Sequence, residues 1–200
     1  MGEVISQMQL RKRELRKHYV QVRSQIGEES AREWDRRILK TLLAMPVITQ
    51  ARCVMTYVSY NREVDTIEFV KFCLANGKSV AVPWADSVRK LLIASELQDF
   101  ERDLHVGPFK VLEPTSTALR PIDPTTIDVH IVPGVAFDEQ GWRIGLGLGY
   151  YDRFLRTIAP SAAKIGLAYE VQVVETLPHE PWDVCMDYVV TENCVLGSKD

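Results

Sequence analysis

Apolar residues recur at helical spacing in the first quarter of the chain and predict two amphipathic helices. The apolar positions of the first helix are Leu15, Tyr19, Val22 and Ile26, at i, i+4, i+7 and i+11. The second helix is predicted over residues 28–44, and Pro46 marks its end. Its apolar stripe consists of Trp34, Ile38 and Leu42. Each helix therefore presents one face to a core.

The apolar runs that follow predict two strands separated by a helix. Residues 53–58 and 79–82 are rich in apolar and β-branched side chains, and Pro83 closes the second run. Between them, Thr66 is expected to cap a helix that ends at Gly77. A strand, a helix and a strand over about thirty residues form a βαβ unit, so the two strands are expected to pair in parallel.

The rest of the chain continues this alternation. Further strands are expected at residues 91–94, 127–132, 164–169 and 188–191, and a helix at residues 150–158. Alternating strands and helices predict an α/β fold with a mostly parallel central sheet and helices on both faces. With 200 residues and no internal repeat, the chain is expected to form a single domain, residues 1–200.

Composition and charge limit the classes of function. Hydrophobic residues make up 46% and charged residues 26%, which argues against intrinsic disorder. The formal net charge of −3 argues against a surface built for nucleic acid. We find no bilayer-spanning apolar run, no signal peptide and no C-x-x-C pair among the four cysteines. We therefore expect a cytoplasmic protein that binds neither membrane nor nucleic acid, with a monomer favoured.

Three alternating glycines, Gly145, Gly147 and Gly149, form the most distinctive segment, and a helix is expected directly after them. Glycine permits positive φ and close backbone approach, and successive N–H groups can form an anion-binding nest beside a helix N-terminus. The segment predicts a phosphate cradle, with a structural turn as the alternative. It is not a Walker A loop, and Tyr150 replaces the third glycine of the G-x-G-x-x-G fingerprint.

Charged residues elsewhere suit a phosphate ligand. Asp152, in the first turn of the expected helix, and Asp183, in a proline-rich turn, are candidate Mg²⁺ ligands, because Mg²⁺ favours one or two carboxylates plus phosphate oxygens. Their alternatives are dipole complementation and turn formation. Lys12, Arg16 and Arg23 fall within about 40° of one another on the first helix. This row is either a clamp for a phosphate or carboxylate, or a solvated face.

The loop at residues 61–66 follows a predicted strand and contains Glu63 and Asp65. Ligands in parallel α/β sheets bind beyond the carboxyl ends of strands, so this is a candidate substrate loop, with helix entry as the alternative. The histidines show no metal spacing; they are His18, His105, His130 and His179. His130 lies in an apolar strand and is expected to be a core residue.

Together these motifs resemble the 5-formyltetrahydrofolate cyclo-ligase family, also called methenyltetrahydrofolate synthetases. The most specific pieces are Val-Pro-Gly-Val-Ala-Phe-Asp at residues 132–138 and the glycine loop that ends in Gly-Tyr-Tyr-Asp-Arg at residues 149–153. Lys-x-x-Leu-Arg at residues 12–16 and Glu-Val-Asp-Thr at residues 63–66 resemble further family segments, in the expected order. The resemblance covers nearly the whole chain.

This resemblance implies a three-layer α/β/α fold shared with sugar-phosphate isomerases and CoA transferases. It also implies an ATP-driven cyclisation with Mg²⁺. The formyl oxygen on N5 of 5-formyltetrahydrofolate attacks the γ-phosphate of ATP, N10 closes the ring, and phosphate leaves, which gives 5,10-methenyltetrahydrofolate and ADP. Such a reaction depends on positioning and charge neutralisation.

The resemblance assigns roles to individual residues. Tyr150, Lys12 and Arg16 would be catalytic, and Lys12 and Arg16 would hold ATP phosphates. The ATP-binding set would be Lys12, Arg13, Glu14, Leu15, Arg16, Arg143, Ile144, Gly145, Leu146, Gly147, Leu148, Gly149, Tyr150 and Tyr151. The folate-binding set would be Val58, Tyr60, Glu63, Leu146, Gly147, Leu148, Gly149 and Tyr150. Asp152 and Asp183 would hold Mg²⁺.

Three positions depart from the family pattern. Family members commonly carry Gly or Lys at the position of Leu148, a basic residue at that of Leu146, and a smaller side chain or His at that of Trp182. Loss of cations would weaken phosphate binding, so a folate- or nucleotide-binding relative without turnover is an alternative. A third reading is a module whose basic first helix meets nucleic acid or membrane, which steep salt dependence of binding would support.

Overall fold

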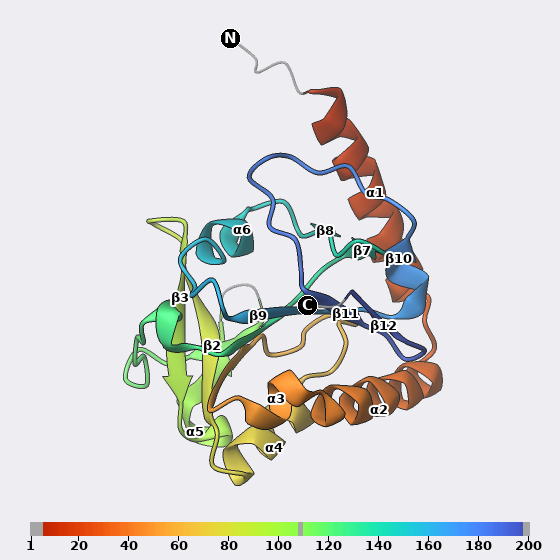
Figure 1. Cartoon of the computed structure of the whole chain (residues 1–200). Helices are drawn as coiled ribbons and strands as arrows, with labels where there is room; N and C mark the ends of the chain where they lie inside the picture. Colours follow the sequence, from red (N-terminus) through yellow and green to blue (C-terminus); the bar gives the residue numbers. More distant parts are fainter. Residues whose placement is uncertain (1–5, 108–109, 198–200) are drawn as a thin grey trace.

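The computed structural model describes residues 6–107 and 110–197. At its centre is a seven-stranded sheet with the strand order β12-β11-β9-β6-β1-β2-β3 (Figure 1). The strands are β1 (Cys53–Thr56), β2 (Ser79–Asp86), β3 (Leu91–Leu97), β6 (Val129–Val132), β9 (Ala163–Leu167), β11 (Tyr188–Val190) and β12 (Val195–Leu196). The five inner strands run parallel, and the edge strands β3 and β12 pair antiparallel with their neighbours.

The inner strands are apolar because both faces of the sheet are covered. Val54 of β1 pairs with Val80 of β2 and with Val129 of β6, and all three side chains are buried. Every residue of β6 is buried. A continuous apolar run of this kind is typical of parallel strands with no solvent-facing side.

Three helices cover one face of the sheet and lie below it in Figure 1. They are α2 (Glu28–Ala44), α3 (Pro46–Gln50) and α4 (Ile67–Ala75). Ile38 and Leu42 of α2 are buried in one hydrophobic cluster with Phe69 and Val70 of α4 and with the strands. The apolar stripe that predicts α2 therefore packs on the sheet.

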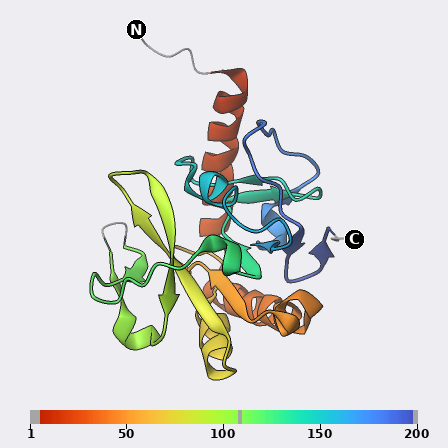
Figure 2. The same ribbon diagram turned by 60° about the vertical axis from the view of Figure 1, so that its left-hand side comes forward.

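The opposite face carries a helix and a three-stranded sheet, with a long helix beside them (Figures 1 and 2). The elements are α1 (Gln7–Ser24), α6 (Tyr150–Phe154), β7 (Ala136–Asp138), β8 (Arg143–Ile144) and β10 (Val173–Val174). The small sheet has the order β10-β7-β8. Phe154 packs with Val189 of the central sheet, and Tyr19 of α1 packs on Ala136 and Ile144. The long helix therefore rests on the small sheet.

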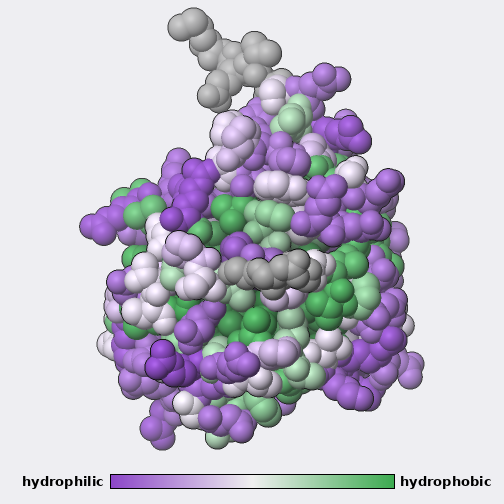
Figure 3. All heavy atoms as spheres, viewed as in Figure 1, coloured by the Kyte–Doolittle hydropathy of each residue, from purple (hydrophilic) through white to green (hydrophobic). Residues whose placement is uncertain are grey.

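The remaining elements are α5 (Phe100–Asp103), β4 (Leu104–Val106), β5 (Leu112–Pro114) and the 3₁₀ turns η1 (Pro124–Thr126) and η2 (Glu170–Gln172). In Figure 3, hydrophobic residues gather in the middle of the face shown, between hydrophilic surfaces above and below. None of the described helices is long and apolar enough to cross a membrane. The four cysteines are free.

The predicted three-layer α/β fold with a mostly parallel sheet is confirmed, but several element boundaries differ. β2 continues through Pro83 to Asp86. β1 pairs with β2 only at residues 79–81, so Pro83 lies where β2 is bonded on one side and a missing N–H is tolerated. The first helix ends at Ser24, the helix after the glycine loop ends at Phe154, and Pro46 begins α3.

Candidate active site

A cavity of about 1020 Å³ is lined by α1, the glycine loop, the loop after β1 and the β2–β3 hairpin. The predicted residues that line it are Lys12, Arg13, Arg16, Tyr60, Glu63, Asp183 and all of residues 143–152. Glu14, Leu15 and Val58 are not among the lining residues. Val58 is 2% exposed in the core under α2, Leu15 packs on the small sheet, and Glu14 is exposed.

Two basic side chains of α1 reach into this cavity. The Nζ of Lys12, which is 9% exposed, donates to Oε2 of Glu180 at 2.9 Å and to the carboxylate of Asp183. The Nε of Arg16 donates to the carbonyl of Gly145 at 2.7 Å, and burial lowers the pKa of this guanidinium. The basic row is therefore not a solvated face, because its members are held against protein groups.

Arg23, the third member of the row, holds the loop that carries Glu63. Its Nη2 donates to the carbonyl of Asn61 at 3.2 Å. Asn61 and Arg62 have φ of 52° and 65°, an uncommon conformation for residues other than glycine. Glu63 lines the cavity and accepts a hydrogen bond from the N–H of Tyr60 at 3.1 Å. Burial raises the pKa of Glu63, and the charge of Arg23 opposes that rise.

The same loop also begins α4, so it serves both of the roles considered for residues 61–66. Oδ1 of Asp65 accepts hydrogen bonds from the N–H of Ile67 at 2.9 Å and from the hydroxyl of Ser59 at 2.7 Å. The predicted side-chain cap by Thr66 is wrong, because its hydroxyl instead donates to the carbonyl of Tyr57. Asp65 therefore stabilises the start of α4, and Glu63 is the carboxylate of this loop that lines the cavity.

The glycine loop, residues 145–149, offers a row of N–H donors. No described residue accepts a hydrogen bond from the backbone N–H of these five positions. Gly147 and Gly149 have φ of 94° and 65°, and a Cβ on Gly147 would lie 3.1 Å from Cζ of Arg16. Unpartnered N–H groups beside a guanidinium are typical of an anion-binding nest. Because α6 has only five residues, its dipole adds less than the sequence suggests.

Two buried donors on the same wall lack partners. The Nη2 of Arg143 donates to Oδ1 of Asp152 at 3.0 Å, but its Nε has no hydrogen-bond partner among the described residues, and neither does the hydroxyl of Tyr151. Burial lowers the pKa of Arg143, which the charges of Asp152 and Asp183 oppose. A buried unpartnered polar group costs about 1–3 kcal/mol, so this wall suits a ligand with acceptor oxygens.

The charges of Asp152 and Asp183 both act to raise the pKa of Arg143. Asp152 forms an ion pair with Arg143, and Asp183 forms one with Lys12. Within the described residues, no three His, Cys, Asp or Glu side chains gather to hold a metal unaided. Two carboxylates that need further oxygen ligands fit Mg²⁺ bound with phosphates. The donor set is therefore compatible with the metal that the sequence predicts.

Sequence reasoning missed several cavity residues, including Glu180 and Arg153. Glu180 stands three positions before Asp183, and this spacing of two acids is the signal that the sequence offers. Leu146 and Leu148, which depart from the family pattern, are 68% and 63% exposed at the cavity wall. Both side chains are therefore largely accessible to solvent at the mouth of the site and are not packed into the core.

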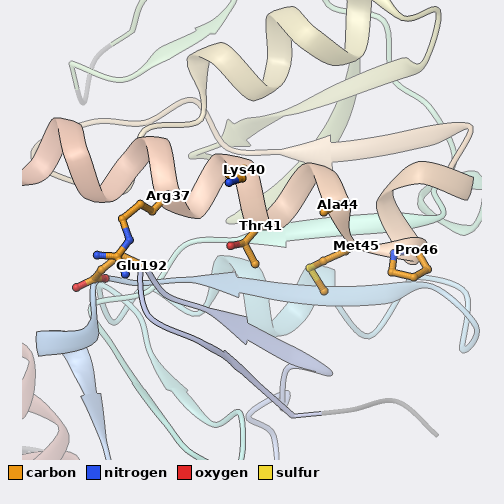
Figure 4. Close-up of a pocket in the computed structure, with 7 residues that line it drawn as sticks. All are labelled: Arg37, Lys40, Thr41, Ala44, Met45, Pro46 and Glu192. Atoms are coloured by element: carbon orange, nitrogen blue, oxygen red, sulfur yellow. The ribbon is translucent and has the colours of Figure 1, made fainter.

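A second cavity, of about 600 Å³, lies along α2 on the other side of the central sheet (Figure 4). Its lining consists of Arg37, Lys40, Thr41, Ala44, Met45, Pro46 and Glu192. In Figure 4, Arg37 and Glu192 lie together at one end, away from Met45 and Pro46. No predicted site residue lines this cavity, so the first cavity is the candidate active site.

Comparisons with known proteins show the family to which the chain belongs. Residues 8–192 match the sequence model of the 5-formyltetrahydrofolate cyclo-ligase family. The chain is 31% identical over 178 residues to 5-formyltetrahydrofolate cyclo-ligase of Escherichia coli K12, with 88% of this chain and 97% of that protein covered. Among solved structures, it is similar to 5,10-methenyltetrahydrofolate synthetase from Aquifex aeolicus, with a TM-score of 0.83, 32% identity, and 94% and 93% of the two chains covered. It is also similar to the synthetase from Mycoplasma pneumoniae, with a TM-score of 0.74, 25% identity and coverage of 90% and 98%.

Proposed function

Since the chain belongs to the 5-formyltetrahydrofolate cyclo-ligase family, we propose that it cyclises 5-formyltetrahydrofolate to 5,10-methenyltetrahydrofolate in a reaction that uses ATP and Mg²⁺. ATP supplies the phosphoryl group that activates the formyl oxygen, and ADP and phosphate are released. The family match supports the cyclo-ligase activity, and the cavity supports the ATP and Mg²⁺ parts of the proposal.

The observation that carries the proposal is the row of unpartnered N–H groups at residues 145–149 beside the guanidinium of Arg16. Phosphoryl transfer is governed by positioning and by neutralisation of charge on phosphate oxygens. Backbone N–H groups that are already oriented do this without reorganisation at the moment of reaction. A loop that presents free donors on one wall therefore suits an ATP triphosphate.

The cations around the loop complete the phosphate end. Lys12, Arg16 and Arg143 line the cavity and would hold phosphate oxygens, and the unpartnered Nε of Arg143 has a donor to spare. Asp152 and Asp183 would hold Mg²⁺, which would neutralise negative charge on the phosphate groups. In this assignment Lys12 keeps the buried carboxylates neutralised when no ligand is bound.

The folate end would be formed by the loop after β1. Glu63 and Tyr60 line the cavity there. Burial raises the pKa of Glu63, because it disfavours the charged carboxylate. An N–H donor on a ligand would stabilise that charge by a hydrogen bond. Tyr150, at the start of α6, lines the wall beside the glycine loop and would face the reacting groups. Val58, which lies in the core, would support this loop without touching the ligand.

We further propose that one domain, residues 1–200, carries the activity as a cytoplasmic monomer. The family match over residues 8–192 supports one functional unit. The cavity takes its lining from both ends of a single chain, which supports a monomer. The four free cysteines agree with a reducing compartment.

The test is to mix the purified protein with 5-formyltetrahydrofolate and Mg²⁺, with and without ATP, and to follow methenyl absorbance together with ADP. We expect absorbance to rise only with ATP and in equal amount to ADP, and to stop when a chelator removes Mg²⁺. Folate binding by calorimetry without turnover would instead support the non-catalytic relative, with Leu146 and Leu148 as the physical cause. Absence of both turnover and folate binding would contradict the proposal.

A further inference from the structure

One arginine on α6 joins two separate segments of the cavity wall. The Nε and Nη2 of Arg153 donate to the carbonyl of Lys90 at 3.1 and 2.7 Å, and Nη2 also donates to the carbonyl of Leu148 at 3.1 Å. Lys90 lies in the turn between β2 and β3, and Leu148 lies in the glycine loop. A single guanidinium therefore bridges the backbones of two segments that are distant in sequence.

The β2–β3 turn has little else to hold it. Val88 at its tip is 90% exposed, and Oδ1 of Asp86 accepts hydrogen bonds from the N–H groups of Val88 and Arg89 within the turn. In the described part of the chain, the bonds from Arg153 are the only hydrogen bonds that tie residues 87–90 to anything outside the hairpin. Figure 2 shows the hairpin rising beside α6, and its residues Ala85 and Leu92 line the cavity.

The glycine loop is held by guanidinium groups at both ends. Arg16 binds the carbonyl of Gly145, and Arg153 binds that of Leu148. A Cβ on Gly149 would lie 2.9 Å from Nη1 of Arg153, so glycine leaves room for this side chain. With both carbonyls engaged by cations, the N–H groups of the loop stay free for a ligand.

Arg153 also touches the side chain that we place nearest to the reacting groups. Its Cζ lies 5.4 Å from the centroid of the Tyr150 ring, which is within cation–π range. The guanidinium therefore makes contact with the ring, with the glycine loop and with the hairpin turn. No other side chain described in this cavity donates hydrogen bonds to both the glycine loop and the hairpin turn.

We propose that Arg153 is a positioning residue that locks the glycine loop to the β2–β3 hairpin, so that a ligand bound at the loop also orders the hairpin wall. The proposal rests on the proposed function for the nature of that ligand, the ATP phosphates. The lock itself is a property of the free protein. Arg153 acts through backbone carbonyls and through Tyr150 and takes no part in the chemistry.

The first experiment needs no ligand. Amide hydrogen exchange is measured on the full chain for the wild type, Arg153→Ala, Arg153→Lys and Arg156→Ala. Arg156 is the matched control, because it is an arginine on the same cavity wall with no hydrogen bond or ion pair among the described residues. We expect about tenfold faster exchange at residues 87–92 and 145–149 in Arg153→Ala, an intermediate effect in Arg153→Lys, and no change in Arg156→Ala. If these residues exchanged in Arg153→Ala at the same rate as in the wild type, the proposal would be overturned.

The second experiment adds ATP and Mg²⁺ without folate. In the wild type, we expect slower exchange in both the loop and the hairpin turn. In Arg153→Ala, protection should persist in the loop but disappear from the turn, and the ATP affinity from calorimetry should fall roughly tenfold. Equal protection of the turn in both proteins would overturn the coupling. An absence of ATP binding by the wild type would contradict the proposed function, while the ligand-free exchange still decides the lock.

Kinetics separate positioning from general loss of structure. Arg153 is an exposed residue, so Arg153→Ala should change the melting temperature little while the KM for ATP rises more than kcat falls. Arg153→Lys keeps the charge but cannot span two carbonyls with a planar fork, so only partial recovery is expected. A fall in melting temperature with unchanged KM would return Arg153 to a purely structural role.

Discussion

The sheet face under α2 and α4 is closed mainly by aliphatic and aromatic side chains, whereas the layer of α1, α6 and the small sheet buries charges. Ile38 and Val70 on the first side are no more than 1% exposed. On the second side, Lys12 and Arg143 are less than 10% exposed. Buried charges contribute little net stability even when paired, and they are costly when a partner is lost. The comparison teaches that stability should depend on one side of this molecule and ligand affinity on the other.

The largest effect on stability is expected from the apolar side. Ile38→Ala removes buried carbon from the cluster between α2 and the sheet and leaves a cavity, so the free energy of unfolding should fall by about 2–5 kcal/mol. Denaturant titration measures this loss. The ATP affinity of the folded fraction should stay unchanged. A drop in ATP affinity that matches the drop in stability would break the comparison.

The converse change is Arg16→Ala on the charged side. Its guanidinium lies against the glycine loop, so the KM for ATP should rise about 30- to 100-fold, which corresponds to about 2–3 kcal/mol. Thermal unfolding should be nearly unaffected, because the side chain is only half-buried. Lys17→Ala, an exposed neighbour on the same helix, is the control. Lost stability with intact nucleotide affinity would place Arg16 with the structural residues.

Asp152→Asn should sharpen the comparison, because it tests the proposed Mg²⁺ ligand separately from the phosphate-binding cations. The amide keeps the size of the side chain but loses the charge that pairs with Arg143, so kcat/KM should fall about tenfold and recover in part as Mg²⁺ is raised. Activity measured over a range of Mg²⁺ concentrations decides this. If kcat/KM and its dependence on Mg²⁺ were the same in the variant and the wild type, Asp152 would not be a metal ligand.

The smallest effect concerns a neutral histidine in the sheet. Burial, with a smaller effect from Lys164, lowers the pKa of His130 to about 4 from its ordinary value of 6.5. Between these values the unfolded chain binds the proton and the folded chain does not, so stability falls as the pH drops. The contribution is about 1 kcal/mol between pH 7 and pH 5.5.

His130→Leu tests this prediction by denaturation at both pH values. Both ring nitrogens lack hydrogen-bond partners among the described residues, so the leucine variant should keep its stability at pH 7 and lose part of the acid sensitivity. An identical pH dependence in both proteins would show that other groups control it.

Features that depend on local spacing could be predicted from the sequence. The limits of α2 agree with residues 28–44, because the apolar stripe and Pro46 are unambiguous, and the βαβ unit follows from its turn residues. The small sheet could not be predicted, because β8 and β10 have two residues each and carry no period. Val58 lies two residues beyond the end of β1, and its burial in the core follows from the apolar run at residues 53–58 and not from the ligand set that the resemblance implies.

The candidate site shows the same division. The glycine loop, Asp152 and Glu63 carry local signals, since each stands in a loop or at a helix start. Glu180 and Arg153 gain their roles from contacts with residues far along the chain, at separations of 168 and 63 positions. Such contacts are a product of tertiary structure, which one sequence does not reveal.

The ion pair between Lys12 and Asp183 also has a consequence for the order in which the protein is made. These residues stand 171 positions apart. During synthesis, α1 leaves the ribosome before Asp183 is added, so the Lys12 side chain stays without this partner while the residues between them are made. The helices and first strands on the α2 and α4 side are encoded by residues 28–86, so they are synthesised early. The ligand-binding side is therefore the last part of the molecule to be finished.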